Sequence, residues 1–126
     1  MNNKLIFIVD DEPAICRLMR ILLEDTGYDI KEFHNGAELM EELLHSALPE
    51  LVLLDIMLPG MNGYDICRFI KNDPAFMHIK VLLFSALSEN EMKGKAEVSG
   101  ADAYFSKNIE LEDLREKIIT AINPQL

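Results

Sequence analysis

The chain has 126 residues, which is enough for one domain built around a single hydrophobic core. Hydrophobic residues make up 49% of the sequence, and this share excludes an extended disordered chain. The formal net charge of −10 argues against a nucleic-acid-binding surface, but it is compatible with sites for cations and with basic partner surfaces.

The first predicted strand covers residues 4–9 and is followed by Asp10-Asp11-Glu12-Pro13. Its five apolar residues are too few for a signal peptide or a membrane span, so we expect a cytosolic protein with no membrane partner. Proline suits the first turn of a helix, and the preceding acids suit the positive end of the helix dipole. A helix is therefore predicted over residues 13–26, ending before Gly27.

Four further strand–helix pairs follow in the same pattern. The predicted strands are residues 28–33, 50–55, 79–84 and 101–106, and the predicted helices are residues 37–47, 63–72, 88–98 and 110–122. The helix over 88–98 is the weakest, because Gly94 lies inside it and few of its residues are large and apolar. Cys16 and Cys67 lie far apart without a CxxC spacing, so we expect reduced core thiols.

The first, third and fourth predicted strands are the most uniformly apolar. A continuous apolar run such as residues 51–54 is typical of a strand buried on both faces, as in a parallel sheet. We therefore place these three strands centrally. The prediction is an α/β fold of the (βα)5 type, with a doubly wound, five-stranded parallel sheet in the order 2-1-3-4-5.

Polar residues stand at the ends of four predicted strands. Asp10 and Asp11 follow the first strand, and Asp55 ends the third. Ser85 follows the fourth strand, and Lys107 follows the fifth. The carboxyl ends of the strands in an open α/β sheet form one edge, where ligands bind. We therefore expect these five side chains to meet at that edge.

Three carboxylates at one edge repel one another, since two like charges about 4 Å apart cost roughly 4 kcal/mol at an effective dielectric near 20. A magnesium ion would relieve this repulsion, with Asp11 and Asp55 as direct ligands and Asp10 acting through water. The cation would also neutralise a phosphoryl group attacked by the Asp55 carboxylate, which would give an acyl phosphate. Lys107 would supply a second positive group and Ser85 a hydroxyl donor.

Each of these residues has a simpler interpretation when it is taken alone. Asp10 and Asp11 could belong only to the acidic start of a helix, and Asp55 could be a surface loop acid. Lys107 alone is typical of a solvated surface lysine, and Ser85 alone of a turn hydroxyl. Their joint placement at four strand ends favours a common site.

Four segments of the chain resemble the receiver domain of two-component response regulators. They are residues 9–13, residues 53–63, Ser85-Ala86 and residues 100–107. The resemblance covers essentially residues 1–126 and implies a CheY-like fold. It also implies that Asp55 accepts a phosphoryl group from a histidine kinase or a phosphotransfer protein. Asp11, Asp55 and the backbone carbonyl of Met57 would hold Mg2+, with Asp10 acting indirectly.

The resemblance also implies a switch. Ser85 would hydrogen-bond the phosphoryl group, Lys107 would pair with it, and Tyr104 would turn inward as the hydroxyl residue moves. The alternative for Tyr104 is a strand aromatic at the margin of the core. The predicted helix over 88–98 is the best candidate for the element that shifts, because it is marginal.

Two features depart from the family pattern. Asn108 stands where the family usually has a proline preceded by a cis bond, and a cis bond without proline costs roughly 3 kcal/mol. The Lys107–Asn108 bond is therefore either strained and cis, or trans with a rearranged loop. Met57 and Leu87 occupy the positions that tune loss of the phosphoryl group. Both are apolar and neither can orient a water, so we expect slow self-dephosphorylation.

The predicted helix over 13–26 carries an apolar arc wider than one sheet face requires. Receiver domains use this face to dock a kinase's helical bundle, and Ile15 and Leu18 are our candidates for it. The alternative is a deeply buried helix. The chain ends soon after the last predicted helix, so it is either a single-domain regulator or a piece of a longer protein. Its last strand and helix lack the second acid after Asp102 and the Lys-Pro-Phe run that are common in receivers of transcription factors, which favours the first.

Two other functions compete with a phosphoacceptor domain. One is a receiver-like module that binds an output partner without being phosphorylated, to which Asn108 lends slight support. The other is a magnesium-dependent phosphatase with an aspartyl-phosphate intermediate. That class would require a second acid two residues after the nucleophile, where this chain has Met57. Beyond its own phosphorylation and dephosphorylation, we expect no conventional enzymatic turnover.

Overall fold

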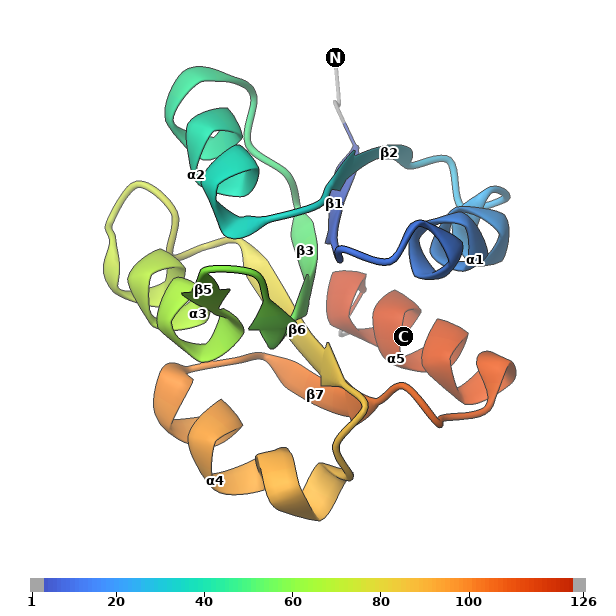
Figure 1. Cartoon of the computed structure of the whole chain (residues 1–126). Coiled ribbons are helices and arrows are strands. Elements are labelled where there is room, and N and C mark those ends of the chain that lie inside the picture. Colours follow the sequence, from blue (N-terminus) through green and yellow to red (C-terminus); the bar gives the residue numbers. More distant parts are fainter. Residues whose placement is uncertain (1–3, 124–126) are drawn as a thin grey trace.

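The computed structural model describes residues 4–123, and these form a five-stranded parallel sheet with helices on both faces (Figure 1). The strands of the sheet are β1 (Leu5–Val9), β2 (Asp29–Phe33), β3 (Leu51–Asp55), β6 (Lys80–Ser85) and β7 (Ala103–Ser106). The helices are α1 (Pro13–Leu23), α2 (Gly36–His45), α3 (Gly63–Asn72), α4 (Glu89–Ser99) and α5 (Leu111–Ile122). The strand order β2-β1-β3-β6-β7 confirms the predicted doubly wound α/β fold.

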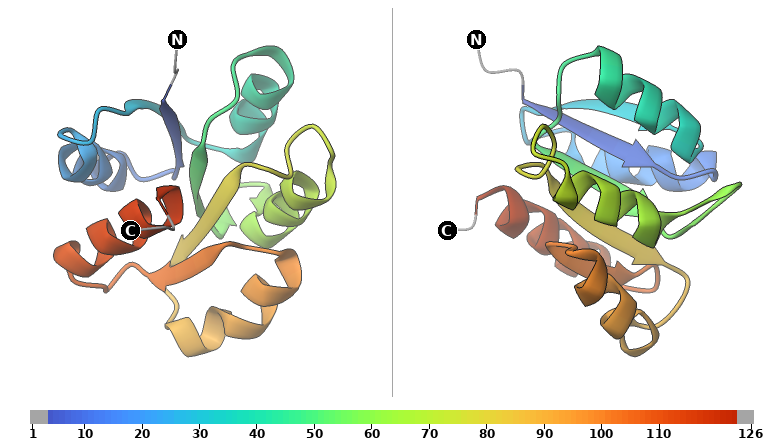
Figure 2. Two further views of the ribbon diagram at one scale, coloured as in Figure 1. Left: turned by 180° about the vertical axis from the view of Figure 1, so that it is seen from behind. Right: turned by 90° about the vertical axis from the view of Figure 1, so that its left-hand side faces the viewer.

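The helices form two layers around the sheet. α1 and α5 cover one face, and α2, α3 and α4 cover the other, with α3 in the middle (Figures 1 and 2). The hydrophobic cluster under α2, α3 and α4 includes Phe7 and Val52. The cluster under α1 and α5 takes the intervening strand positions, such as Ile8 and Leu53. None of the helices within residues 4–123 is long and apolar enough to cross a membrane.

The positions of β1 and β3 inside the sheet explain why their sequences are continuous apolar runs. Every residue of β1 and β3 is buried, since each strand has a neighbour on both sides and a helical layer on both faces. Alternate side chains therefore enter opposite clusters, and both sets must be apolar. Asp55, the last residue of β3, is the one charged residue of these two strands, and it too is buried.

The strand register sets the carboxyl ends of the strands at one edge of the sheet. The pairs at this edge are Val9 with Leu54, Asp55 with Phe84, and Ser85 with Ser106. Asp10 and Asp11 directly follow β1, and Lys107 directly follows β7. The predicted meeting of these residues at one edge is therefore confirmed at the level of the backbone.

Helix α1 ends at Leu23, earlier than the predicted residue 26. The hydroxyl of Thr26 donates to the carbonyl oxygen of Leu23 at 2.6 Å, and Arg115 Nη1 donates to that of Leu22 at 2.8 Å. These side chains satisfy carbonyls that further helical turns would otherwise have used. Gly27 then adopts a left-handed conformation with φ of 84°, so the chain turns toward β2.

A short antiparallel hairpin, formed by β4 (Met57–Leu58) and β5 (Met61–Asn62), was not predicted. It lies between β3 and α3. At its end Gly63 donates its N–H to the Ile56 carbonyl at 2.8 Å. A Cβ at position 63 would lie 2.5 Å from the Asp55 carbonyl oxygen, so only glycine fits against this backbone. The end of the hairpin therefore packs closely against the backbone of Asp55 and Ile56.

Helix α4 is capped at both ends. The Ser88 side chain accepts from the Glu91 N–H and the Glu91 side chain accepts from the Ser88 N–H, which forms a capping box. Gly100 closes the other end in a left-handed conformation with φ of 85°. The buried residues of the helix are Met92, Ala96 and Ser99. This small contact area agrees with the predicted weak helix at this position.

Candidate functional site

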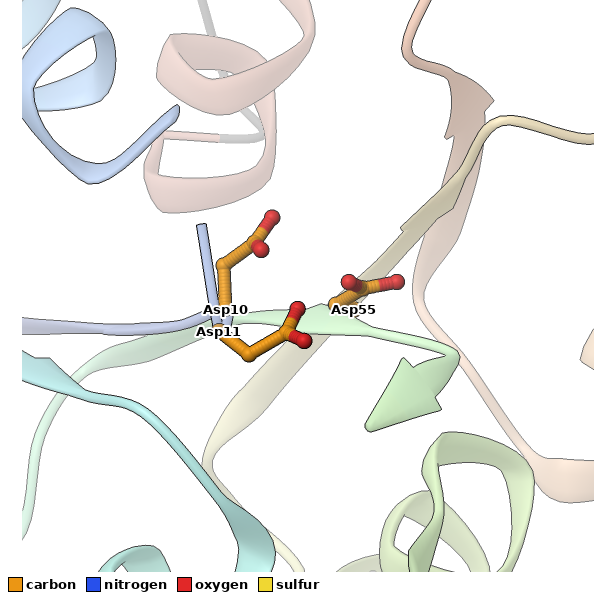
Figure 3. A group of neighbouring side chains, drawn as sticks. All are labelled: Asp10, Asp11 and Asp55. Carbon is orange, nitrogen blue, oxygen red and sulfur yellow. The ribbon is translucent and has the colours of Figure 1, made fainter. Parts of the chain in front are cut away.

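Three carboxylates meet at the carboxyl edge of the sheet. Asp10, Asp11 and Asp55 each offer one oxygen, and these oxygens all lie within 4.8 Å of one another (Figure 3). Asp10 and Asp55 are buried, whereas Asp11 is exposed. The structure therefore brings together the three acids that the sequence placed at this edge, with one of them open to solvent.

The two carboxylate oxygens of Asp10 have different surroundings. Its Oδ1 accepts from the Glu12 N–H at 2.8 Å, and its backbone N–H donates to the Phe33 carbonyl at 3.0 Å. Its Oδ2 is buried and accepts no hydrogen bond from residues 4–123, although Lys107 Nζ lies 3.0 Å away as an ion-pair partner. Burial raises the pKa of Asp10 to about 6 despite these favourable contacts.

Lys107 is the counter-charge of the cluster. Its Nζ lies 3.0 Å from Asp10 Oδ2, 3.2 Å from Asp55 Oδ2 and 3.1 Å from Glu12 Oε1. Burial alone would lower the pKa of Lys107, but the pairing with Asp10, Asp55 and Glu12 outweighs it, and the pKa is raised. The pairing of Glu12 with Lys107 was not predicted from the sequence. The position of Glu12 in the acidic run after β1 was the available signal.

The Lys107–Asn108 bond is trans, since residues 4–123 contain no cis peptide bond. The lysine nevertheless reaches the acids, because its backbone N–H donates to the Ser85 carbonyl at 2.7 Å. The Asn108 N–H donates to Ser106 Oγ at 3.2 Å. Of the two alternatives left open by the sequence, the trans bond is the one observed, and the loop still delivers Lys107 to Asp55.

Asp55 is fixed by both of its oxygens. Oδ1 accepts from the Met57 N–H at 3.0 Å, and Oδ2 faces Lys107. The carboxylate is only 3% exposed, yet it borders the exposed Asp11. The Met57 contact to the cluster is this N–H, while its side chain is 65% exposed. A cleft beside the cluster runs from Asp11 along the β4–β5 hairpin.

Ser85 and Tyr104 lie near the cluster without contacting it. Ser85 is fully buried, and its Oγ accepts from the Leu87 N–H at 3.2 Å. Within the described residues, no hydrogen bond joins that hydroxyl to Asp55. Tyr104 is half-buried and pairs with Leu83 in the sheet, where it packs against the same hydrophobic cluster as Leu87. The hydroxyl and the aromatic ring thus flank the loop that leads to α4.

The candidate docking residues on α1 differ in exposure. Leu18 is 36% exposed, whereas Ile15 is half-buried and packs against the hydrophobic cluster under α1 and α5. Ile21, which was not singled out in the sequence, is 64% exposed. The apolar arc of α1 is therefore wider than the part that the sheet covers, as the sequence indicated.

The donor set suits a hard divalent cation. All three side chains are carboxylates, and such ions prefer oxygen ligands and accept one or two carboxylates together with water. The buried Asp10 Oδ2 has Lys107 Nζ as its one charged neighbour among the described residues, at 3.0 Å, and the exposed Asp11 leaves the cluster open to an ion. The residues present therefore fit a cation at this edge, and the combined charge of the acids exceeds what Lys107 alone offsets.

Comparison with known proteins places the chain in a family. The family model of the response regulator receiver domain matches residues 6–119. RpaA, a DNA-binding dual master transcriptional regulator of Synechocystis sp., is 34% identical over 113 residues, which make up 90% of this chain and 46% of that protein. DivK, a polar-differentiation response regulator of Brucella anthropi, is 31% identical over 115 residues, or 91% of this chain and 93% of DivK.

A solved structure gives the same result. The phosphorylated cyanobacterial phytochrome response regulator RcpA superposes with a TM-score of 0.83 at 25% identity, covering 98% of this chain and 96% of that one. The chain spans less than half the length of RpaA but nearly all of DivK. A phosphoacceptor signalling role fits these relatives. The chain belongs to the response regulator receiver domain family.

Proposed function

We propose that this chain takes a phosphoryl group on Asp55 from a histidine kinase or a phosphotransfer protein. The observation that carries the proposal is the buried Asp55 carboxylate, with Lys107 Nζ at 3.2 Å and oxygens of Asp10 and Asp11 within 4.8 Å. A nucleophile, a fixed ammonium and a set of cation ligands are the parts that phosphoryl transfer to a carboxylate requires. The phosphorylated relative RcpA supports the same reaction here.

We propose that the cation is Mg2+. Asp11 and Asp55 would hold it directly together with the Met57 carbonyl, and Asp10 would act through a water. The three carboxylates share one ammonium from Lys107, and this excess of negative charge supports an ion at this point. When bound, the ion would neutralise the oxygens of the incoming phosphoryl group.

In the proposed transfer, a carboxylate oxygen of Asp55 attacks the phosphorus of the phosphohistidine. The new O–P bond forms as the P–N bond breaks, and the donor histidine, protonated on its other ring nitrogen, leaves as a neutral imidazole. The Met57 N–H holds the carboxylate in position through Oδ1. Lys107, already beside Oδ2, pairs with the transferred oxygens, so its charge needs no large reorganisation.

A movement of the Ser85 hydroxyl would pass the signal from Asp55 to the surface of the protein. That hydroxyl, now bonded to the Leu87 N–H, would turn to the phosphoryl group, and Tyr104 would fill the space that opens. The loop between β6 and α4 contains Leu87, so this movement would be passed to α4. A downstream partner that distinguishes the two positions of α4 would then read the signal.

The first test is intact-mass measurement after incubation with MgCl2 and acetyl phosphate. We expect one added phosphoryl group, which is absent without divalent ions and absent in Asp55→Asn. The matched control is Asp29→Asn, an exposed acid on the edge strand β2, which should be labelled like the wild type. No added mass would favour a receiver-like module that is not phosphorylated, and fast turnover of the donor would favour a phosphatase.

The kinase-docking part has its own test. Replacing Ile15 and Leu18 by alanine should slow transfer from the phosphorylated kinase while leaving transfer from acetyl phosphate unchanged. Leu44→Ala is the matched control, since Leu44 is 61% exposed on α2. If both donors slow equally, the double variant has damaged the site rather than a docking face.

A further inference from the structure

A groove lies between α3 and α4, with a volume of about 470 Å3. Pockets of this size hold small molecules. The two helices run next to each other on one face of the sheet (Figure 2). The α3–α4 groove is lined by Tyr64, Asp65 and Arg68 from α3 and by Gly94, Lys95 and Val98 from α4. Asn62, the N-cap of α3, completes the lining. Of these residues, Asn62 and Asp65 also line the cleft beside the acidic cluster, and the others lie outside that cleft.

The charge of the α3–α4 groove is unusual for this protein. The chain carries 22 acidic and 12 basic residues, yet neither Arg68 nor Lys95 forms an ion pair with any residue in 4–123. Among the described lining residues, Asp65 is the single acid, so the lining carries two positive charges and one negative. A concave surface with unpaired cations favours an anionic ligand.

The α3–α4 groove also has an apolar part. A Cβ added at Gly94 would meet no atom within 4 Å, which shows that the space above this residue is open. Val98 follows one helical turn later and is 73% exposed. An apolar ring placed here would cover the Val98 side chain without displacing any protein atom near Gly94.

Tyr64 supplies a further observation that points to a ligand. The residue is 7% exposed, and its hydroxyl oxygen is buried without a hydrogen-bond partner in the described part of the chain. Lys95 Nζ lies 6.0 Å from the centroid of the Tyr64 ring. An anion paired with this ammonium would therefore lie beside Tyr64, whose hydroxyl has no acceptor in the described part of the chain.

We propose that the α3–α4 groove binds a small aromatic carboxylate. The ring would lie over Gly94 and against Val98, and the carboxylate would pair with Arg68 and Lys95 and accept from the Tyr64 hydroxyl. Because the ligand bridges two helices, it would favour the position of α4 described above. The site is separate from Asp55, and the unphosphorylated chain can bind the ligand. Because the ligand and the phosphoryl group would both act on α4, phosphorylation of Asp55 would change the affinity for the ligand.

The test is a titration of the unphosphorylated chain with naphthalene-2-carboxylate, followed by amide chemical shifts in NMR. We expect saturable shifts centred on Gly94 and Val98. The neutral analogue 2-naphthamide should bind roughly tenfold or more weakly, because it lacks the charge-assisted contacts. Equal binding of the amide, or no saturable shift at α4, would overturn the proposal.

Variants locate the binding. Arg68→Gln combined with Lys95→Gln should weaken the carboxylate roughly tenfold or more, and Tyr64→Phe should weaken it severalfold. Lys93→Gln is the matched control, since Lys93 is an exposed lysine of α4 outside the groove lining, and it should leave the affinity unchanged. A double variant that binds like the wild type, or a control that loses as much, would show that the carboxylate binds elsewhere.

Discussion

The half-buried ammonium of Lys107, whose side chain is 16% exposed, pairs with three acids at once. We expect Lys107→Gln to lower the free energy of unfolding in EDTA by on the order of 3 kcal/mol, because Asp10 and Asp55 would stay buried without a counter-charge. Urea unfolding measures this. Lys93→Gln, on the exposed side of α4, should change little. Equal stabilities of the two variants would contradict the assigned role of Lys107.

The thiol of Cys16 is fully buried, and burial together with the nearby Glu32 and Asp10 charges raises its pKa to about 11. Burial also raises the pKa of Cys67. We therefore expect the folded chain to resist thiol reagents at pH 8, where few thiolates form, while the unfolded chain reacts at both cysteines. Rapid labelling of the folded chain would contradict the packing of α1.

The same shift predicts a pH dependence. The folded state keeps the Cys16 proton above the ordinary cysteine pKa of 9.0, up to about pH 11. The stability that this proton contributes is fully present below pH 9 and is lost as the pH rises toward 11. Cys16→Ala should show a shallower loss of stability over this range in urea unfolding.

Met57 and Leu87 lie two residues after Asp55 and Ser85, and their apolar side chains are exposed and half-buried respectively. Neither orients an attacking water, so we expect slow loss of phosphate. Leu87→Glu should accelerate it roughly tenfold or more by positioning that water. Intact mass followed over time measures the half-life. A fast loss in the wild type that Leu87→Glu leaves unchanged would refute the prediction.

At the scale of elements, the junction of the hairpin with α3 positions the nucleophile. Gly63→Ala would place a Cβ 2.5 Å from the Asp55 carbonyl oxygen and 2.6 Å from Ile56 Cα. Backbone atoms cannot yield cheaply, so we expect a loss of roughly 1–3 kcal/mol and slower phosphorylation. Gly94→Ala is the matched control, since its Cβ meets nothing within 4 Å, and it should be neutral or stabilising by up to about 1 kcal/mol.

The elements also show what the sequence could predict. Apolar runs followed by polar residues were sufficient for the sheet and for the meeting of Asp10, Asp55 and Lys107, because the carboxyl ends of parallel strands lie at one edge. The end of α1 depended on a hydroxyl from Thr26 and on Arg115, which lies 93 residues from its partner Leu22. Such contacts leave no local periodic signal.

The details of the site were harder to predict than its composition. The β4–β5 hairpin is two residues per strand, too short for an alternating pattern to be recognised. The orientation of Ser85 toward the Leu87 N–H and the pairing of Glu12 with Lys107 are set by side-chain torsions in the folded state. Sequence spacing places a residue at the edge of the sheet but does not fix such torsions.

At the scale of the whole molecule, cations can stabilise the fold in two ways. Any salt screens the net charge of −10, whereas a divalent ion can also bind the acidic cluster. We expect Mg2+ at about one hundred times its dissociation constant to raise the free energy of unfolding by about 2.7 kcal/mol. NaCl of equal ionic strength should do less, because it only screens the charges. Thermal unfolding compares the two salts. Asp11→Asn should reduce the magnesium effect, and identical effects of both salts in the wild type would contradict a specific site.

The capping of α4 bears on how the whole molecule would transmit a signal. The capping box at one end and the left-handed glycine at the other satisfy backbone groups at both ends of α4, which offsets part of its limited packing. Its buried residues are Met92, Ala96 and Ser99, so its apolar packing against the rest of the fold is limited. Phosphorylation would therefore displace α4 as a rigid rod instead of melting it. Amide exchange should then stay slow within the helix while the packing around Met92 changes.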